Sequence, residues 1–158
     1  MLFQIIFTLL TYQYSFDFTH NDLHTNNIMY TSIKEHFLWY KYDDEYYKVP
    51  PYGLIFKIID FGRNIYKYKS KLFSSGNFNT LGDASSQYNC EPYFNDKKPR
   101  LDPNYSFDLC RLACSIYDLT IDEDTDMNNL NDFQKIFIYR LWMIIIIIYY
   151  LKKTLMIV

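Results

Sequence analysis

Two short polar segments constrain this chain more than any other feature of its sequence. The first lies between Phe18 and Met29 and fits H-x-D-L-x-x-x-N, with His20, Asp22, Leu23 and Asn27 at the defined positions. The second is Asp60-Phe61-Gly62, which directly follows the apolar run 54–59. Asn and Asp dominate ordinary turns, so either pattern alone would favour a polar turn. The two patterns in this order, with the second entered from an apolar strand, instead indicate a single composite site.

The first pattern resembles the catalytic loop of the protein kinase-like superfamily, and the second resembles the D-F-G motif that follows it there. The resemblance implies phosphoryl transfer with ATP and Mg²⁺ as cofactors. In such reactions the protein mainly positions a hydroxyl group and holds metal ions against the phosphate oxygens. The resemblance makes Asp22 the catalytic residue that accepts or orients the hydroxyl proton. It makes Asn27 and Asp60 the cofactor-binding ligands of Mg²⁺, which prefers oxygen.

The same resemblance assigns supporting roles around this site. His20 and Phe61 are expected to be packing residues that shape the loop, and Gly62 is expected to allow the backbone turn after the metal ligand. Asp108 stands near the start of a segment with helical spacing, 106–118, which resembles the central helix of the large kinase lobe. Its implied role is to accept hydrogen bonds from the catalytic-loop backbone. A helix cap or a first-turn acid is the ordinary alternative for Asp108, and both roles can hold together.

The predicted fold class is α+β: a mostly helical, kinase-like C-terminal lobe with short catalytic-loop strands and an inserted β-hairpin. Residues 1–140 would form this lobe, with the catalytic loop at 20–27, the D-F-G motif at 60–62 and an activation segment at about 63–105. Apolar residues at helical spacing in 2–10 predict an amphipathic helix, with Gln4, Thr8 and Thr11 between them. A signal peptide is the competing interpretation, but no Lys or Arg precedes Lys34.

Four short segments are predicted to be strands. The run 28–31 follows the catalytic loop, and 54–59 leads into Asp60. Between them, 37–40 and 46–49 flank the turn-prone Asp43-Asp44-Glu45 and predict a hairpin inserted between two strands of the lobe. Its aromatic residues are interpreted as sheet packing and not as a ligand platform. The stretch 63–105 is polar and has no sustained period, so no regular structure is predicted there.

Composition and charge bound the class of protein. With 158 residues, 49% of them apolar, the chain can bury the core of one domain. Sixteen basic and eighteen acidic residues give a net charge of −2, so nucleic acid is not an expected partner. The three cysteines form no C-x-x-C pair, which favours neither a zinc site nor a disulfide framework. A cytoplasmic location is expected, in the host cytoplasm if the protein is viral.

The nucleotide-holding half of a kinase is not recognisable in these residues. The four glycines never form G-x-G-x-x-G, no lysine lies in a V-A-I-K-like context, and nineteen residues precede His20. We therefore expect the N-terminal lobe to be absent from this chain or separately encoded, and the chain alone to bind ATP weakly.

The segment 141–158 is an anomalous hydrophobic tail. Its uncharged run, 141–151, is shorter than the ~20 residues that span a bilayer, so a buried helix is favoured over a membrane anchor. A shifted reading frame is a third explanation, because a one-base shift converts Asn codons into Ile codons.

Several functions remain open. A kinase-like phosphotransferase acting on protein hydroxyls is the first, and the loop resembles kinase-like proteins of large DNA viruses with AT-rich genomes. His24 favours a small-molecule phosphotransferase, since D-x-H-x-x-N resembles aminoglycoside and choline kinases. The third candidate function is a non-catalytic pseudokinase or interaction module, and the fourth is a membrane-tethered remnant.

Overall fold

A computed structural model describes residues 1–79, 81–87, 104–121 and 125–141. Most of the second half of the predicted activation segment and nearly all of the hydrophobic tail lie outside these residues. Among the described residues, none of the helices combines the length and the apolar character that a membrane span requires.

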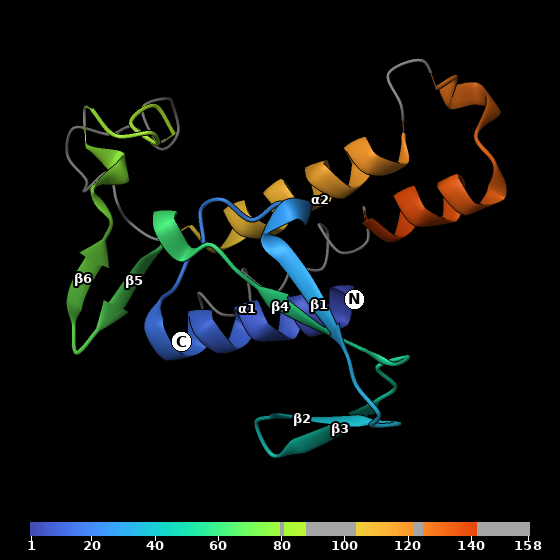
Figure 1. The fold of residues 1–158 in the computed structure, drawn as a ribbon, viewed down its shortest axis with the longest axis horizontal. Coiled ribbons are helices and arrows are strands. Elements are labelled where there is room, and N and C mark those ends of the chain that lie inside the picture. Colours follow the sequence, from blue (N-terminus) through green and yellow to red (C-terminus); the bar gives the residue numbers. More distant parts are fainter. Residues whose placement is uncertain (80, 88–103, 122–124, 142–158) are drawn as a thin grey trace.

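The described chain is a mixed α+β fold, in agreement with the predicted class (Figure 1). Its α-helices are α1 (Leu2–Phe16), α2 (Tyr105–Thr120) and a further helix at 132–141. The strands form three two-stranded antiparallel sheets. These strands are β1 (Ile28–Ser32), β2 (Leu38–Tyr42), β3 (Glu45–Val49), β4 (Leu54–Ile58), β5 (Ile65–Tyr68) and β6 (Lys71–Ser74).

The helix α1 is amphipathic, but one polar residue that was predicted to lie between the apolar positions, Gln4, faces the interior. Gln4 is buried, because its amide pairs with the backbone of β4: Nε2 donates to Leu54 O at 3.0 Å, and Oε1 accepts from Phe56 N at 2.9 Å. Burying an amide costs little free energy when its nitrogen and its oxygen are both hydrogen-bonded. Helical periodicity could not reveal this role, because it reports only which residues are apolar.

The pairing of β1 with β4 brings the two sequence patterns together. These strands are antiparallel, with Ile28 opposite Ile58 and Ser32 opposite Leu54. The start of β1 and the end of β4 therefore lie at the same edge of the sheet. At this edge Ile59 N donates to Asn27 O at 3.0 Å, so Asn27 and Asp60 are held next to each other along the backbone.

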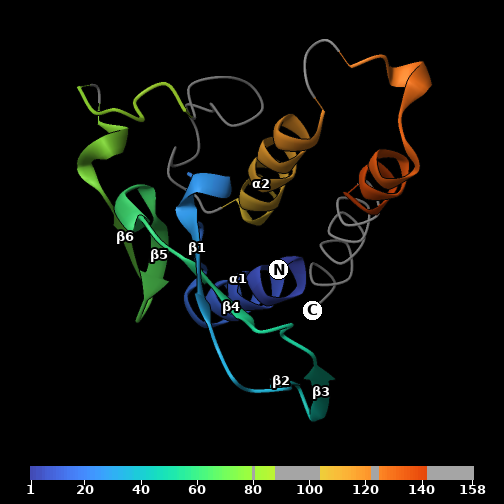
Figure 2. The same cartoon turned by 45° about the vertical axis from the view of Figure 1, so that its right-hand side comes forward.

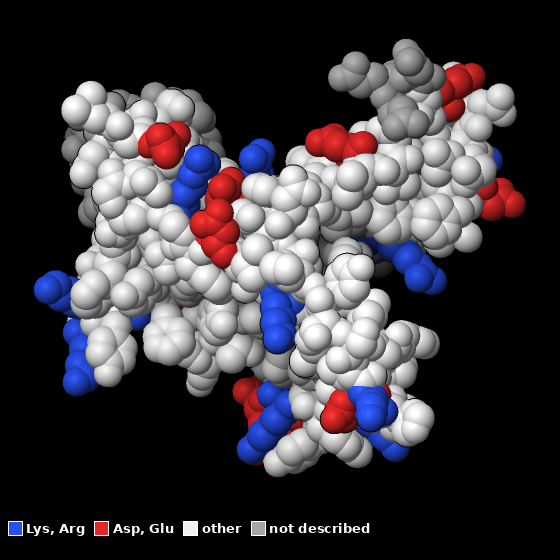
Figure 3. Space-filling model, in the orientation of Figure 1, with Lys and Arg blue, Asp and Glu red and all other residues white. Residues whose placement is uncertain are grey.

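The hairpin predicted from the turn at residues 43–45 is present as β2 and β3. It projects from the helices in both views (Figures 1 and 2). Tyr40 contacts α1. The Tyr40 ring lies 5.0 Å from the Phe3 ring and 4.8 Å from the Phe7 ring. On the face shown in Figure 3, basic and acidic side chains are interspersed, including those at this hairpin.

The prediction of no regular structure after Arg63 was wrong for residues 65–74. Here β5 and β6 form a hairpin whose turn residues, Lys69 and Ser70, have φ of 48° and 62°. Such turns favour Asn-Gly or Asp-Gly, so Lys-Ser gave no turn signal in the sequence. The hairpin is held in place by Thr19, whose N–H and carbonyl bond to the carbonyl and N–H of Ile65 at 2.8 and 2.9 Å.

The helix α2 begins one residue earlier than predicted and supplies much of the core. Its N-cap is Asn104, whose side chain accepts from Ser106 N at 3.2 Å. The buried core joins α1, α2, the loop at residues 20–27, β4 and the end of the helix at 132–141. Its members are Ile5, Leu9, Leu23, Ile58, Leu109, Leu112, Ala113, Ile116 and Leu141.

Candidate functional site

Asp108 fastens the loop 20–27 to the helix α2. Its side chain is fully buried, with Oδ2 accepting from His20 N and Oδ1 from Asn21 N, each at 2.7 Å. Burial raises the pKa of Asp108, and the two backbone donors act in the opposite direction. These are the hydrogen bonds that the resemblance implied. Asp108 also lies in the first turn of α2, but the cap is Asn104.

His20 and Phe61 connect the loop to the second pattern. Nε2 of His20 lies 2.9 Å from Ile59 O, and the His20 and Phe61 rings are 5.3 Å apart. Phe61 also lies 5.9 Å from the Phe18 ring and 6.3 Å from the Tyr12 ring. His20 and Phe61, both predicted to be packing residues, contact each other within an aromatic cluster that the sequence did not indicate. Tyr12 belongs to this cluster because it lies near the end of α1.

Asp60, and not Gly62, makes the unusual backbone turn in the second pattern. Asp60 has φ 60° and ψ 69°, a left-handed conformation that costs a non-glycine residue some strain, whereas Gly62 has no positive φ. The explanation predicted for Gly62 was thus wrong. Glycine at position 62 instead avoids a close contact, because a Cβ there would lie 3.3 Å from Asp60 Oδ1. The Asp60 side chain is exposed and accepts weakly from Gly62 N at 3.4 Å.

Asn27 is buried and oriented by the loop itself. Its Nδ2 donates to Asp22 O at 2.9 Å and lies 3.3 Å from His24 Nε2. Since these contacts engage the nitrogen of the amide, the amide oxygen is the atom available to a cation. The backbone of Asn27 is fixed on both sides, by Ile59 N and by the carbonyl of His24.

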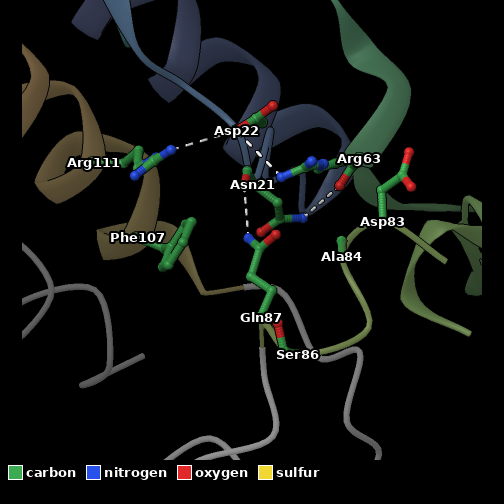
Figure 4. Close-up of a pocket in the computed structure, with 9 residues that line it drawn as sticks. All are labelled: Asn21, Asp22, Arg63, Asp83, Ala84, Ser86, Gln87, Phe107 and Arg111. Carbon is green, nitrogen blue, oxygen red and sulfur yellow. Dashed lines mark hydrogen bonds and ion pairs between the residues drawn. The ribbon is translucent and has the colours of Figure 1, made fainter. Parts of the chain in front are cut away.

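The Asp22 carboxylate lies among three basic side chains. Oδ1 is 3.5 Å from Arg63 Nη1, 3.8 Å from Arg111 Nη2 and 4.0 Å from His24 Nε2. Figure 4 shows the two arginines approaching Asp22 from two sides. Neither arginine was predicted as a site residue. Arg111 could have been found, because it lies three positions after Asp108 and so shares a face of α2 with it.

A pocket of about 210 Å³ opens beside Asp22 (Figure 4). The loop residue Asn21, the helix α2 and the segment 83–87 form its walls. Gln87 closes one side, with Nε2 donating to Asn21 O at 2.6 Å. The segment reaches this place through a tight turn in which Ala84 N donates to Asn77 O at 2.9 Å. A Cβ at Gly82 would lie 2.2 Å from that oxygen, so only glycine fits there.

The residues at the sheet edge fit Mg²⁺ in donor chemistry but do not form a complete cage. An exposed carboxylate at Asp60 and an amide oxygen at Asn27 are the hard oxygen ligands that Mg²⁺ prefers. Within the described ranges, no group of three His, Cys, Asp or Glu side chains could hold a metal ion by itself. Such a pair suits an ion whose remaining ligands are phosphate oxygens and water.

Comparison with known proteins identified no relative: no family model matches the sequence, and no curated protein matches it.

Proposed function

We propose that this chain carries the phosphotransfer site of a protein kinase-like phosphotransferase. The observation that supports this most directly is that one loop is fastened on two sides. Asp108 holds its backbone from α2, and His20 binds the carbonyl of Ile59, immediately before Asp60. Two polar patterns more than thirty residues apart are thereby hydrogen-bonded to each other at one sheet edge. Phosphoryl transfer relies mainly on such positioning.

In this proposal the chain's own residues have distinct tasks. Asp22 orients the substrate hydroxyl and receives its proton, while Asn27 and Asp60 offer oxygen ligands to Mg²⁺. When bound, Mg²⁺ neutralises the charge on the ATP phosphates. The hydrogen bond from Asn27 Nδ2 to Asp22 O couples the two halves of the site, because it fixes the amide relative to the Asp22 backbone. The acceptor is a hydroxyl of a protein or of a small molecule.

A small-molecule phosphotransferase is the second candidate, and the position of His24 favours it. His24 Nε2 lies 4.0 Å from Asp22 Oδ1 and 3.3 Å from Asn27 Nδ2. This histidine therefore occupies the place between the hydroxyl-orienting and metal-binding residues. D-x-H-x-x-N, to which it belongs, resembles the loop of aminoglycoside and choline kinases.

Manganese titration tests the metal site without requiring turnover. Mn²⁺ takes the same oxygen ligands as Mg²⁺ and broadens nearby NMR signals even when it binds weakly. We expect the amide signals of Asn27, Ile59 and Asp60 to broaden first in the intact chain, and this selectivity to disappear in Asp60→Ala. The matched control is Asp118→Ala, an exposed aspartate on α2. Equal broadening in Asp60→Ala and the intact chain would refute the proposed ligand set.

ATP binding by these 158 residues alone should be weak. The sequence contains neither G-x-G-x-x-G nor a V-A-I-K-like lysine to hold the phosphates, and a separately encoded N-terminal lobe could supply both. Calorimetry with Mg-ATP should give a dissociation constant in the millimolar range or weaker. A radiolabelled transfer assay should give little product. Micromolar binding with turnover that Asp60→Ala abolishes would contradict this expectation.

A further inference from the structure

We propose that the pocket beside Asp22 is an anion subsite, in which Arg63 and Arg111 hold a carboxylate or phosphate group of the substrate that bears the acceptor hydroxyl. This inference rests on the proposed function, because it takes Asp22 as the residue that orients that hydroxyl. It narrows the substrate class to hydroxyl compounds or hydroxyl side chains with a neighbouring acidic group.

The two guanidinium groups have unused donors at the pocket. Each lies near Asp22 Oδ1, at 3.5 Å for Arg63 and 3.8 Å for Arg111, which is beyond the usual length of an N–H···O hydrogen bond. Among the described residues, neither guanidinium makes a hydrogen bond. An arginine has five N–H donors in a fixed planar arrangement that matches carboxylate and phosphate oxygens. These donors are therefore available to an anionic group that enters the pocket.

The two arginines place positive charge beside Asp22, although the charges of the whole pocket balance. Asp22, Asp83, Arg63 and Arg111 all line the pocket, so its formal net charge is zero. Within the described chain Asp83 forms no ion pair with either arginine, and the other three side chains sum to +1 at the Asp22 end. The arginine side chains are 32% and 52% exposed, so a solute can reach both. Partial burial of Arg63 also reduces screening by salt.

The size of the pocket limits what it can hold. Its volume of about 210 Å³ is below the ~300–1,000 Å³ of pockets that enclose a whole drug-sized ligand. It has room for an acidic group and the few atoms that join it to a hydroxyl, but not for a nucleotide. The side of the pocket formed by Gln87 and Asn21 is closed by their hydrogen bond of 2.6 Å. The acidic group would therefore lie against Arg63 and Arg111, with the hydroxyl toward Asp22.

The acidic group has two sources that share this chemistry. One is a small hydroxy acid, and the other is a peptide in which Asp or Glu flanks Ser or Thr. Both place an oxyanion within a few bonds of the acceptor hydroxyl. The subsite recognises the anion in either case, so binding experiments with both sources distinguish them.

NMR titration of the isotope-labelled 158-residue chain tests the subsite directly. The probes are two matched pairs: glycerate against glycerol, and a serine hexapeptide flanked by Asp and Glu against one flanked by Asn and Gln. In at least one pair we expect the acidic probe to bind at least tenfold more tightly, with shifts at Arg63 and Arg111. The pair that shows this preference identifies the source. Equal binding within both pairs would overturn the proposal.

Three variants attribute the preference to the two arginines. Arg63→Gln and Arg111→Gln should each weaken binding of the acidic probe about tenfold or more, as expected for loss of a charged hydrogen-bond donor. Arg140→Gln, at an exposed arginine of the helix 132–141, should leave it unchanged. Arg111 is itself half exposed, so Arg111→Gln should fold even if Arg63→Gln does not. Retained preference in Arg111→Gln would refute the subsite.

The manganese titration separates this proposal from the proposed function. Arginine-dependent anion binding without selective broadening at Asn27 and Asp60 would leave the anion subsite in place but refute the metal site. Selective broadening without a preference for acidic probes would support the metal site and refute the subsite. Sodium chloride should weaken binding of the acidic probes much more than binding of the neutral ones.

Discussion

At the scale of single residues, Asp108 has the largest predicted effect. Asp108→Ala would leave the buried N–H groups of His20 and Asn21 without acceptors, and each such loss costs ~1–3 kcal/mol. We expect the free energy of unfolding to fall by about 2–6 kcal/mol, a large part of the ~5–15 kcal/mol of a typical domain. Denaturant unfolding measures this change. Hydrogen exchange at His20 and Asn21 should also accelerate.

The control for this change lies on the same helix. Asp118 is an exposed aspartate of α2, and Asp118→Ala should change stability by no more than ~0.5 kcal/mol. If the two variants were equally stable, Asp108 would not be the anchor of the loop.

At the scale of elements, Asp17 connects the end of α1 to the start of α2 and to β5. Its Oδ1 accepts from Tyr105 Oη at 2.6 Å, and Oδ2 lies 3.3 Å from Lys67 Nζ. The hydrogen bond from Tyr105, followed by the contact with Lys67, lowers the pKa of Asp17. The pKa of Tyr105 is raised by its burial and by this bond to Asp17.

Tyr105→Phe should remove the stronger of these contacts. Because the Asp17 side chain is 45% exposed, we expect a loss of about 1 kcal/mol at neutral pH, less than the ~1.5–3 kcal/mol of buried charged hydrogen bonds. A lowered pKa contributes stability that is present above the unfolded value of ~3.9 and is lost as the pH falls through the folded value.

The measurement is thermal unfolding at a series of pH values from 7 to 2. Wild type and Tyr105→Phe should differ at neutral pH and converge in acid, once Asp17 is protonated in both. Tyr14→Phe, which removes the hydroxyl of an 89% exposed tyrosine on α1, should match wild type throughout. A constant difference between wild type and Tyr105→Phe across this range would contradict the role given to Asp17.

At the scale of the whole molecule, the hairpin formed by β2 and β3 should be dispensable for folding. None of its residues belongs to the buried core, and its aromatic contacts with α1 are made through Tyr40. Replacing residues 34–52 with a short Gly-containing turn should retain the β1–β4 pair. The expected cost is about 1–3 kcal/mol, since each aromatic pair contributes ~0.5–1.5 kcal/mol beyond the area that it buries.

Circular dichroism during thermal unfolding would measure the cost of this deletion. Leu112→Ala, which truncates a buried core residue, is the contrasting variant and should cost about 2–5 kcal/mol. A deletion that unfolds the chain completely would show that the hairpin is part of the core.

The sequence by itself determined the elements that depend on local chemistry. Helical spacing predicted residues 2–10 of α1, which continues to Phe16, and most of α2. The acidic turn at residues 43–45 predicted the projecting hairpin, with strand ends shifted by one or two residues. Apolar runs predicted β1 and β4. The pattern of His20, Asp22 and Asn27 indicated which loop carries the candidate site. Each of these features is encoded within a few neighbouring residues, which is why no three-dimensional information was needed.

Only the tertiary structure decided which distant groups complete the site. Arg63 and Arg111 meet at Asp22 because η2 (Phe61–Arg63) and α2 pack on opposite sides of the loop. Gln4 bonds to β4 across about fifty residues, and β5 pairs with β6 through a turn that lacks the usual glycine. Pairings of this kind depend on the long-range arrangement of the chain and on the burial of polar groups. Neither leaves a periodic signal along the sequence.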